Sequence, residues 1–396
     1  MEINIKDGYK VTEVGVIPDD WEVKKLGELL KFKNGINADK KYYGEGIKFI
    51  NILEIIQKRY LFYQDIPGFV TIDSATIKSN LVQLGDILFN RTSETQEEVG
   101  LTSVYLDNKD VVFGGFVIRG RPINNLLDYF FSQYAFSSAI VRNQIIKRGQ
   151  GAIRANIGQS DLKEVCIPLP PLAEQKAIAH ALSDVDNLIT AIDQLITKKR
   201  NLKQGTMQEL LTGKKRLPGF SGKWEVKKLG DILKVKHGKS QHNIIDENGK
   251  FPILATGGEI GKTNTYLYNK PSVLIGRKGT IDIPQYMDTP FWTIDTLFYT
   301  EIFNNAVPKF VFYKFNLINW YSYNEASGVP SLNAKTIENI DINFPKNVLE
   351  QKAIAEILTD MDKEIEALEK KRDKYKTIKQ GMMQELLTGK TRIIDN

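Results

Sequence analysis

Polar and basic side chains at the ends of predicted strands are the ones in this chain best suited to recognise a ligand. Arg91 follows the run DILFN (86–90), and Arg277 follows SVLIG (272–276). The two segments align, so the two arginines occupy matching positions. Arg, Lys, Asn, Gln, Ser and Thr side chains hydrogen-bond to base edges in the DNA grooves. Contact with base edges is therefore one chemistry that these side chains suit.

The candidate DNA-binding residues are all polar or basic and all lie in predicted loops or at strand ends. They are Arg91, Thr92, Ser93, Lys147, Arg148, Gln150, Arg154, Asn156, Lys262, Thr263, Arg277, Lys278, Ser331 and Asn333. The alternative for each of them is an ordinary solvated loop residue. Because Arg91 and Arg277 are matched between two copies, contact with DNA is favoured most at these two positions.

Patterns that would indicate catalysis are incomplete. TGGEIGKT (256–263) resembles a phosphate-binding loop, but Thr256 stands where the first glycine is required and no helical pattern follows, so a β-loop is predicted. DDWEVK (19–24) offers an acidic pair and a lysine, as in nucleases. Its repeat GKWEVK (222–227) lacks the acidic pair, which favours a packing role for Trp21 and Trp224. The three histidines have no companion cysteine, so no zinc site is predicted.

The elements that must position the candidate loops occur twice. PLAEQKAIA (171–179) returns as VLEQKAIA (348–355), and KQGTMQELLTGK (203–214) returns as KQGMMQELLTGK (379–390), at a constant offset of 176 residues. A second repeat, WEVKKLG, begins at Trp21 and again at Trp224. Repeated helical segments thus alternate with segments that differ in content. This plan predicts a protein that does one job twice, on two different targets.

Both repeated segments are predicted to be long helices with a narrow apolar seam. Apolar residues recur in steps of three and four, which is a heptad pattern. In the first copy they are Ile178, Leu182, Val185, Ile189, Ile192 and Ile196; in the second they are Ile354, Leu358, Met361, Ile365 and Leu368, then Tyr375, Ile378, Met382 and Leu386 after a break at Arg372. Matched seams predict that the two helices pair with each other. The alternative is a pair of ordinary long helices in a globular core.

The ends of these helices carry recognisable signals. Pro170 and Pro171 precede the first helix, and Asn347 with Glu350 resembles a capping box at the second. Gly213 and Gly389 stand where a glycine would end each helix. A helix from about 174 to 211 would be roughly 57 Å long.

The bulk composition is that of a mixed α/β (α+β) protein with four segments. Residues 1–171 and 217–346 contain short β-branched and aromatic runs, and residues 172–216 and 347–396 are helical. The net charge of +6 permits nucleic-acid binding without indicating it. A single cysteine excludes an internal disulfide framework and favours a cytoplasmic location. The chain shows neither a membrane-length apolar run nor a signal peptide.

PLPPLAEQKAIA (168–179), the recurring ELLTGK and WEVKKLG together resemble the specificity (S) subunit of type I restriction-modification systems. The resemblance covers essentially the whole chain. One departure is that the second copy reads FPKNVLEQ (344–351) and lacks the PPL of the first. This departure leads us to expect a differently built start of the second helix.

The resemblance implies a DNA specificity subunit with no catalytic activity. Two target recognition domains each bind one half of a split double-stranded DNA target. Two helices pair as an antiparallel coiled coil that sets the distance between the two domains, and the whole chain forms a pseudo-two-fold repeat. Two methyltransferase (M) subunits bind the helical region, and restriction (R) subunits join the complex. The chain then binds no cofactor itself, since S-adenosylmethionine belongs to the methyltransferase and ATP and Mg to the restriction partner. The residues assigned to partner binding are Glu174, Gln175, Glu350 and Gln351.

Two other classes of protein compete with this interpretation. A fused nuclease or methyltransferase would need a cofactor or metal site, and none is legible. A coiled-coil scaffold that binds only protein would not need two divergent domains with polar loop clusters.

Overall fold

The structure is a computed structural model that describes residues 7–151 and 154–393. It consists of two compact units. Unit 1 contains the chain up to Ala191 and the chain from Arg372 onward, and unit 2 is Ile192–Lys371. Each unit therefore combines one of the two mixed helix-and-strand segments with part of both long helices. The four segments divide the chain along the sequence, and the two compact units cut across them.

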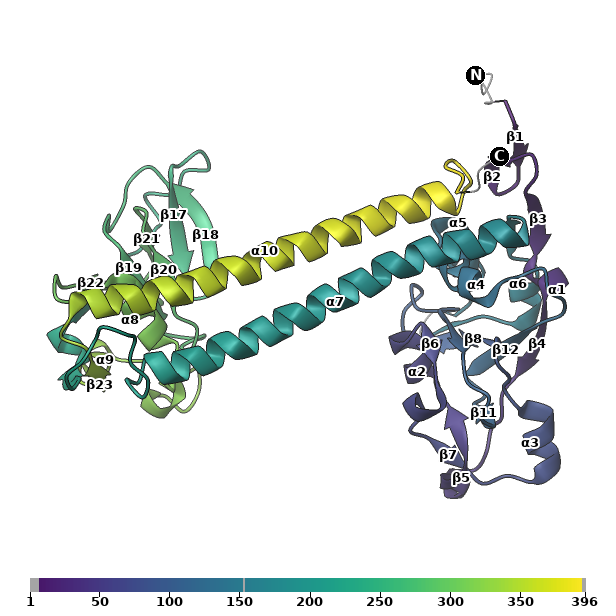
Figure 1. The fold of residues 1–396 in the computed structure, drawn as a ribbon, viewed down its shortest axis with the longest axis horizontal. Helices are drawn as coiled ribbons and strands as arrows, with labels where there is room; N and C mark the ends of the chain where they lie inside the picture. The colour runs from purple at the N-terminus through teal and green to yellow at the C-terminus, as the bar shows by residue number, and fades with distance from the viewer. Residues whose placement is uncertain (1–6, 152–153, 394–396) are drawn as a thin grey trace. The chain divides into compact units, whose positions relative to one another are not determined.

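Unit 1 is built on a five-stranded sheet in the order β4-β12-β8-β10-β6 (Figure 1). Its strands are β4 (Leu30–Asn34), β12 (Val117–Pro122), β8 (Ile87–Asn90), β10 (Thr102–Tyr105) and β6 (Tyr60–Leu61). Neighbours are antiparallel except β6, which pairs in parallel with β10. All four residues of β8 are buried. Side chains alternate across a sheet, so burial of all four means that both faces are covered.

One face of this sheet packs against α4 (Tyr129–Phe136) and α5 (Ala139–Arg148), where Ile87 and Phe89 share a core with Phe131. On the other face Leu88 packs with Ile55 and Phe113. The elements on this second side are α2 (Ile52–Gln57) and the three-stranded sheet β11 (Val111–Phe113), β5 (Tyr43–Ile50) and β7 (Phe69–Val70).

The remaining elements of unit 1 are short. They are the hairpin β1 (Tyr9–Thr12) and β2 (Gly15–Pro18), the pair β3 (Glu22–Lys25) and β14 (Cys166–Leu169), the pair β9 (Thr92–Ser93) and β13 (Ala155–Asn156), helices α1 (Leu26–Leu29), α3 (Ser74–Asn80) and α6 (Gln159–Lys163), and 3-10 turns η1 (Lys40–Tyr42) and η2 (Tyr63–Asp65). Trp21 lies directly before β3 and is fully buried in the core. Its predicted packing role is confirmed.

Unit 2 repeats this construction with fewer elements. Its main sheet has the order β16-β22-β19-β20, which corresponds to β4-β12-β8-β10 of unit 1. Its elements are β15 (Glu225–Lys228), η3 (Leu229–Asp231), β16 (Leu233–Lys236), β17 (Phe251–Ala255), β18 (Gly258–Thr263), β19 (Ser272–Gly276), β20 (Gln285–Met287), β21 (Trp292–Thr293), β22 (Leu297–Ile302), α8 (Pro308–Phe315), η4 (Trp320–Tyr323), α9 (Ala334–Glu338) and β23 (Asp341–Phe344). The phosphate-loop-like segment 256–263 is the β17–β18 hairpin, so the β-loop prediction is confirmed.

The apolar run VVFGGFVI (111–118) contains the whole of β11 and the start of β12. The chain turns between them at Gly115 and Phe116, where the Val117 N–H donates to the Gly114 carbonyl at 2.9 Å. An added Cβ on Gly115 would lie 1.9 Å from Asn37 Oδ1, so a larger residue here would displace the Asn37 side chain. The turn matters for the site, because it carries the carbonyl that holds Arg91.

The two long helices are α7 (Leu172–Leu210) and α10 (Val348–Leu386), each of 39 residues. Both predicted stop signals are confirmed, since Gly213 and Gly389 adopt positive φ angles of 74° and 71°. The capping box predicted at α10 is only half present. The Asn347 side chain accepts a hydrogen bond from the Leu349 N–H at 2.9 Å, but Glu350 binds elsewhere, as described below.

The helices are antiparallel within each unit. In unit 2 Arg200 pairs with Glu369 at 2.5 Å and Lys203 pairs with Asp362, so the partner's number falls as the number along α7 rises. In unit 1, Lys379 of α10 pairs with Asp186 of α7 at 2.5 Å. The antiparallel pairing and the mixed helix-and-strand fold class are therefore confirmed.

Most predicted seam positions are buried, but the seams do more than join two helices. Ile178 and Leu182 lie in the core of unit 1 together with Leu386, and Ile354 and Leu358 lie in the core of unit 2. Helix pairing and the alternative of a globular core thus both apply, each to part of the helix. Ile378, a predicted seam residue, is 39% exposed and is an exception.

Lys314 of α8 gives unit 2 a testable dependence on pH. Its side chain is buried, and Nζ donates a hydrogen bond to the Leu211 carbonyl at 2.9 Å near the end of α7. Burial lowers the pKa of Lys314 from 10.5 to about 8. Between these pH values only the unfolded chain holds the extra proton, so stability rises with pH through this window, by about 3 kcal/mol at ~1.4 kcal/mol per pH unit.

We expect Lys314→Met to remove this rise from pH 8 to 10.5, because methionine has a similar stem and no charge. Denaturation followed by tryptophan fluorescence measures it, since Trp224, Trp292 and Trp320 all lie in unit 2. Lys352→Met, at an exposed position of α10, is the matched control and should keep the rise. Equal pH profiles for the wild type and Lys314→Met would contradict the assignment.

Candidate nucleic-acid interface

Arg91 lies directly after the central strand β8 and is held at both backbone and side chain. Its N–H donates to the Phe116 carbonyl at 2.9 Å, and Nη1 donates to the Gly115 carbonyl at 3.2 Å. Its own carbonyl accepts from the Ile157 N–H at 3.0 Å. The arginine is therefore positioned by the glycine turn on one side and by the strand β13 region on the other.

Arg277 is held in the same way at the end of β19. Its N–H donates to the Thr296 carbonyl at 2.8 Å, and Nη1 donates to the Asp295 carbonyl at 3.2 Å. Its carbonyl accepts from the Leu332 N–H at 2.9 Å. The predicted equivalence of the two arginines thus extends to every backbone contact that positions them. The Asp295 carboxylate, 3.7 Å from Nη1, is an addition in unit 2.

The other candidates gather around these arginines in each unit. In unit 1, Asn156 pairs with Thr92 across β13–β9, with Thr92 Oγ1 and Asn156 Oδ1 2.6 Å apart, and bridges to Gln150. Arg154 is exposed in the same loop, and Lys147 and Arg148 end helix α5. In unit 2, Lys278 and Ser331 form a β-bridge, and Asn333 caps helix α9. Strand pairs and β-bridges join Thr92, Asn156 and Gln150 in unit 1 and Lys278 and Ser331 in unit 2, whereas Arg148 donates to the Glu164 carbonyl at 3.4 Å.

Three candidates do not fit the prediction. Ser93 is only 5% exposed, and its hydroxyl donates to Glu98 Oε2 at 2.9 Å. Thr263 is fully buried, because the backbone of Gly249 packs directly against it. Lys262 is exposed and pairs with Pro252 at one end of the β17–β18 hairpin. The other end, the turn at Thr256, is the end that contacts Gly276, the residue before Arg277. Ser93 and Thr263 are structural, and Lys262 does not join the Arg277 cluster.

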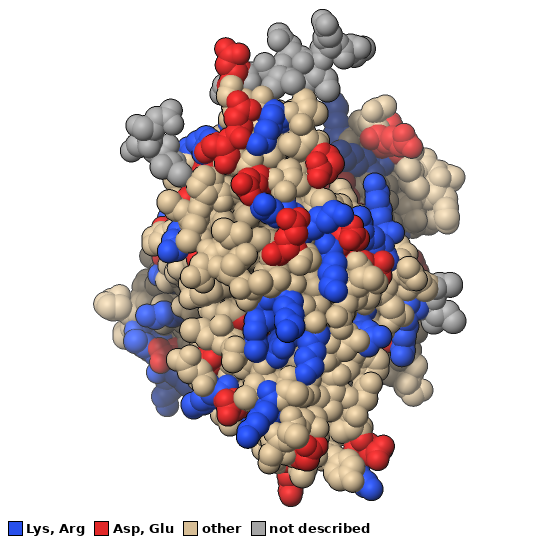
Figure 2. All heavy atoms as spheres, turned by 90° about the vertical axis from the view of Figure 1, so that its right-hand side faces the viewer, with Lys and Arg blue, Asp and Glu red and all other residues tan. Residues whose placement is uncertain are grey.

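Surface charge is mixed rather than of one sign. On the face drawn in Figure 2, one group of Lys and Arg lies near the middle, and above it acidic and basic side chains are intermixed. This agrees with a net charge of only +6. Recognition must therefore depend on particular positioned side chains more than on a general positive field.

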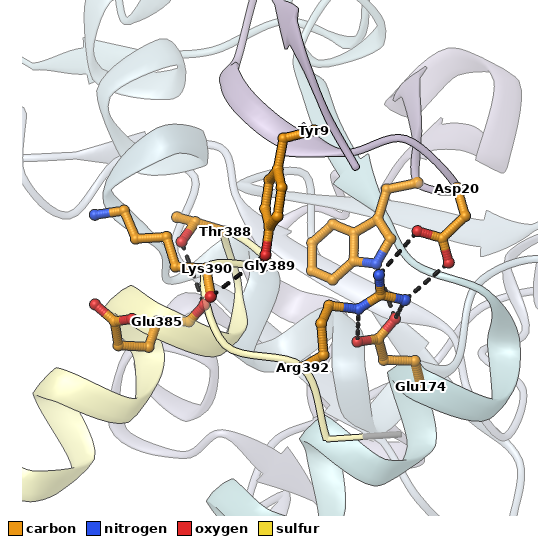
Figure 3. Close-up of polar contacts among 9 residues, drawn as sticks. Tyr9, Asp20, Glu174, Glu385, Thr388, Gly389, Lys390 and Arg392 are labelled. Carbon is orange, nitrogen blue, oxygen red and sulfur yellow. Dashed lines mark hydrogen bonds and ion pairs between the residues drawn. The ribbon is translucent and has the colours of Figure 1, made fainter. Parts of the chain in front are cut away.

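The most strongly connected charged group lies at the start of α7 and is called anchor 1 (Figure 3). Glu174 has no exposed surface. Its carboxylate accepts from Trp21 Nε1 at 2.8 Å and from the Arg392 guanidinium at 2.6 and 2.7 Å. Arg392 also binds Asp20 at 2.8 and 2.9 Å. The hydrogen bond to Glu174, and after it the one to Asp20, raise the pKa of Arg392 above its ordinary value.

Anchor 2 repeats this arrangement at the start of α10. Glu350 is 1% exposed and accepts from Trp224 Nε1 at 3.3 Å and from the Arg216 guanidinium at 2.6 and 2.8 Å. Arg216 follows α7, just as Arg392 follows α10. In each unit, then, the first turn of one long helix is bound by an arginine that follows the end of the other. This is why Glu350 does not complete a capping box.

The glutamines next to these glutamates are equally occupied. Gln175 accepts from the Asp128 N–H at 2.8 Å and donates to the Pro170 carbonyl at 2.9 Å. Gln351 accepts from the Val307 N–H at 2.8 Å and donates to the Pro345 carbonyl at 2.9 Å. The glutamine contacts at the two helix starts are therefore the same. The expected difference is confined to the cap, where Asn347 bonds the Leu349 N–H and the matching Pro171 has no polar side chain.

The burial of these residues corrects one prediction. The four residues assigned to partner binding, Glu174, Gln175, Glu350 and Gln351, are at most 1% exposed. Side chains that are buried and bonded internally offer no surface to another subunit. Their role is to hold each sheet domain on its helices. Arg216 and Arg392, which complete the anchors, were missed, although their spacing is the same 176-residue offset that links Glu174 to Glu350.

A second repeated contact lies further along the helices. Asp186 of α7 accepts from Tyr134 Oη at 2.9 Å and binds Lys379 of α10. In unit 2, Asp362 of α10 accepts from Tyr313 Oη at 2.7 Å and binds Lys203 of α7. Burial is the main cause that lowers the pKa of Lys379. Each sheet domain is thus joined to both helices at two matched places.

Within 7–151 and 154–393, no helix has an apolar stretch that could cross a membrane. The same residues include no group of three or more His, Cys, Asp or Glu side chains placed to hold a metal ion.

A frame built twice, which presents two unlike polar loop clusters at matched positions, is typical of a protein that recognises two different targets. Comparison with known proteins identifies the family. A sequence model of the type I restriction modification DNA specificity domain matches residues 18–202 and 221–377. The chain belongs to this family.

Relatives match over nearly the full length of the chain. The putative type I restriction enzyme MjaX specificity subunit of Methanocaldococcus jannaschii is 29% identical over 98% of this chain and 97% of its own length. The MjaVIII specificity subunit of the same organism is 26% identical over 99% and 98%. The crystal structure of a type I restriction-modification S subunit from M. genitalium shares the fold, with a TM-score of 0.62 at 20% identity over 97% of this chain and 98% of that one.

Anchor 1 predicts a large effect of a residue near the end of the chain. Arg392→Met leaves the Glu174 carboxylate buried without its cation, which typically costs about 3–5 kcal/mol. We expect unit 1 to lose this amount of stability, measured by hydrogen exchange around Trp21 and the end of α10. The double variant Glu174→Gln/Arg392→Met should recover part of the loss, because no charge is then buried.

The matched control is Lys370→Met, which removes a cation from an exposed pair with Glu366. It should leave hydrogen exchange unchanged, since surface pairs contribute little. An Arg392→Met protein as stable as the control would show that the anchor contributes nothing.

Proposed function

We propose that each sheet domain of this chain reads one half of a split double-stranded DNA target, as a target recognition domain. The chain is a DNA specificity subunit, and catalysis belongs to its partner subunits. The observation that carries the proposal is the matched positioning of Arg91 and Arg277 on otherwise different loops. An arginine guanidinium has five N–H donors in a fixed fork, and each of these arginines uses one bond to a backbone carbonyl. The opposite edge suits bidentate contact with guanine.

The differences between the units support two unlike half-sites. Next to Arg91 lie Thr92, Asn156 and Gln150, which are joined by strand pairing and a bridge, whereas Arg277 is accompanied by Lys278 and Ser331. Because direct readout depends on which donors and acceptors face each base, loops of different content select different bases. Arg154, Lys147 and Arg148 would contact phosphates or bases beside the first half-site.

We further propose that the helices bind two methyltransferase (M) subunits, with restriction (R) subunits joining the full complex. The repeated anchors make the two helix ends nearly equivalent, which supports two copies of one partner. Leu195 and Leu202 of α7 are 39% and 56% exposed and stand one heptad apart, so they offer apolar contact where the buried Glu and Gln residues cannot. In this complex S-adenosylmethionine belongs to the methyltransferase, ATP and Mg belong to the restriction subunit, this chain holds no cofactor, and the assembly acts in the cytoplasm.

The two arginines provide the direct test. Arg91→Ala and Arg277→Ala should each weaken binding of the assembled complex by ~1–3 kcal/mol and relax specificity at one base pair, each in a different half-site. Competition binding with targets that vary one base at a time measures both effects. A uniform loss on all sequences with a shallower salt dependence would reassign that arginine to a phosphate. Loss in the same half-site for both variants would contradict the proposal.

A fragment of residues 1–216 tests the assignment of one half-site to each domain. It keeps Glu174 and Arg216, so in a dimer of fragments Arg216 of one copy can take the place of Arg392 against Glu174 of the other. A two-fold dimer reads an inverted repeat. With methyltransferase subunits we expect methylation of a split palindrome made from the first half-site. A folded, dimeric fragment that modifies only the original asymmetric target would refute this assignment.

A further inference from the structure

A cavity of about 310 Å³ in unit 1 lies apart from the two anchors. It is bounded by the end of α2, the start of β10, the end of α4 and the first part of α5. The polar side chains that line it are Gln57, Lys58, Arg59, Thr102, Gln133, Ser137 and Arg142. No carboxylate lines it, so its chemical character is that of hydrogen-bond donors and positive charge.

Two of these side chains have buried donor groups without a hydrogen-bond partner among the described residues. They are Gln133 Nε2 and Arg142 Nη1. Gln133 as a whole is only 2% exposed. A buried N–H group without an acceptor destabilises the folded chain, because it has lost its hydrogen bonds to water. Both groups belong to residues that line the cavity, but both atoms are enclosed, so binding an anion requires these side chains to turn their donors toward it.

The charge of Arg142 is also uncompensated. Its Nη2 donates to the carbonyls of Glu97 and Val99 at 2.7 and 2.9 Å, which satisfies hydrogen bonding but supplies no negative charge. Burial lowers the pKa of Arg142, and no acidic group offsets this effect. The neighbouring cations differ, because Lys58 binds Asp65 at 2.5 Å and Arg59 binds Asp186 at 2.6 Å. Arg142 as a whole is half-buried, but its Nη1 is enclosed. A desolvated cation without a counter-charge is costly, and an anion would offset that cost.

We propose that this cavity binds a phosphate-like oxyanion, held by Arg142 and Gln133. Arg142 supplies charge and a donor fork, and the Gln133 amide supplies a neutral donor. Such donors match the oxygens of a tetrahedral anion. The same chemistry is available from free phosphate and from a phosphate of the DNA backbone.

The site belongs to unit 1 alone. When Tyr134 of unit 1 is aligned with Tyr313 of unit 2, the residue that corresponds to Gln133 is Phe312, which has no amide. Helix α5, which carries Arg142, follows α4 in unit 1, whereas the short turn η4 follows α8 in unit 2. The cavity also lies next to the proposed DNA loop. The segment held by Arg142 contains Glu98, which accepts from Ser93 of β9. An anion at this site would brace the loop that follows Arg91.

The first test is titration of the full chain with inorganic phosphate at constant ionic strength, by calorimetry. We expect saturable binding with one site per chain. Gln133→Leu keeps the carbonyl contacts of Arg142 and should weaken binding about tenfold, and Arg142→Met should abolish it. Lys314→Met removes a buried cation of unit 2 that already has an acceptor, so it should bind phosphate like the wild type. Circular dichroism establishes that each variant is folded.

A second measurement covers the possibility that Arg142→Met fails to fold. Phosphate should raise the unfolding temperature of the wild type and of Lys314→Met, because a ligand that binds only the folded chain stabilises it. The rise should be smaller for Gln133→Leu. If the wild type neither binds phosphate nor is stabilised by it, or if Gln133→Leu and folded Arg142→Met bind as the wild type does, the proposal is overturned.

DNA-binding measurements decide whether the oxyanion is free phosphate or a backbone phosphate of DNA. This part of the test rests on the proposed function. If a backbone phosphate occupies the cavity, Gln133→Leu should weaken DNA binding, folded Arg142→Met should reduce the salt slope by about one, and phosphate should compete with DNA. An unchanged slope together with phosphate binding assigns the site to a free oxyanion. Failure of DNA recognition would leave the phosphate titration unaffected, so the two proposals fail separately.

Discussion

A buried glutamate at the start of each long helix is the constraint on which the rest of the structure depends. Glu174 and Glu350 are almost completely removed from water, and a buried carboxylate is tolerated only when it is paired and hydrogen-bonded. In each unit the required cation comes from beyond the end of the other helix, as Arg392 or Arg216. This choice demands that the helices run antiparallel in each unit. The indole N–H of Trp21 or Trp224, which belongs to the sheet domain, donates to the same carboxylate. One carboxylate thus joins the start of one long helix, the segment after the other long helix and the sheet domain.

The repeated frame and the divergent loops have separate tasks. The anchors, the Tyr134–Asp186 and Tyr313–Asp362 contacts, and the shared strand order position each domain in the same way. The residues next to Arg91 and Arg277 are then free to differ, because they carry no part of the frame. A specificity subunit needs this division, since changing the recognised bases must leave the assembly intact.

Much of the frame was predictable because its signals are local or periodic. The heptad seam, the two terminal glycines and the 176-residue offset predicted α7 and α10 within about two residues, and the matched strand ends predicted the equivalence of Arg91 and Arg277. The burial of Ser93 and Thr263 was not predictable. Both are polar residues at strand ends, and their burial depends on packing by Glu98 and Gly249, which are not adjacent to them in sequence.

The anchors show where a sequence pattern supports more than one interpretation. An acidic residue in the first turn of a helix suits the helix dipole and a capping box, so Glu350 was assigned to a cap. Its true partner, Arg216, lies 134 residues away, and only the equal offset of the two arginines could have indicated it. The oxyanion cavity is further from prediction, since unpaired donors are visible only once every other donor has been placed.

The central claim is that two domains read two unlike DNA segments, and mapping methylated positions in DNA modified by this chain with its methyltransferase subunits tests it most directly. The account predicts a target of two different specific segments separated by a spacer of fixed length and free sequence. A single uninterrupted target, or an inverted repeat read by the intact chain, would contradict it.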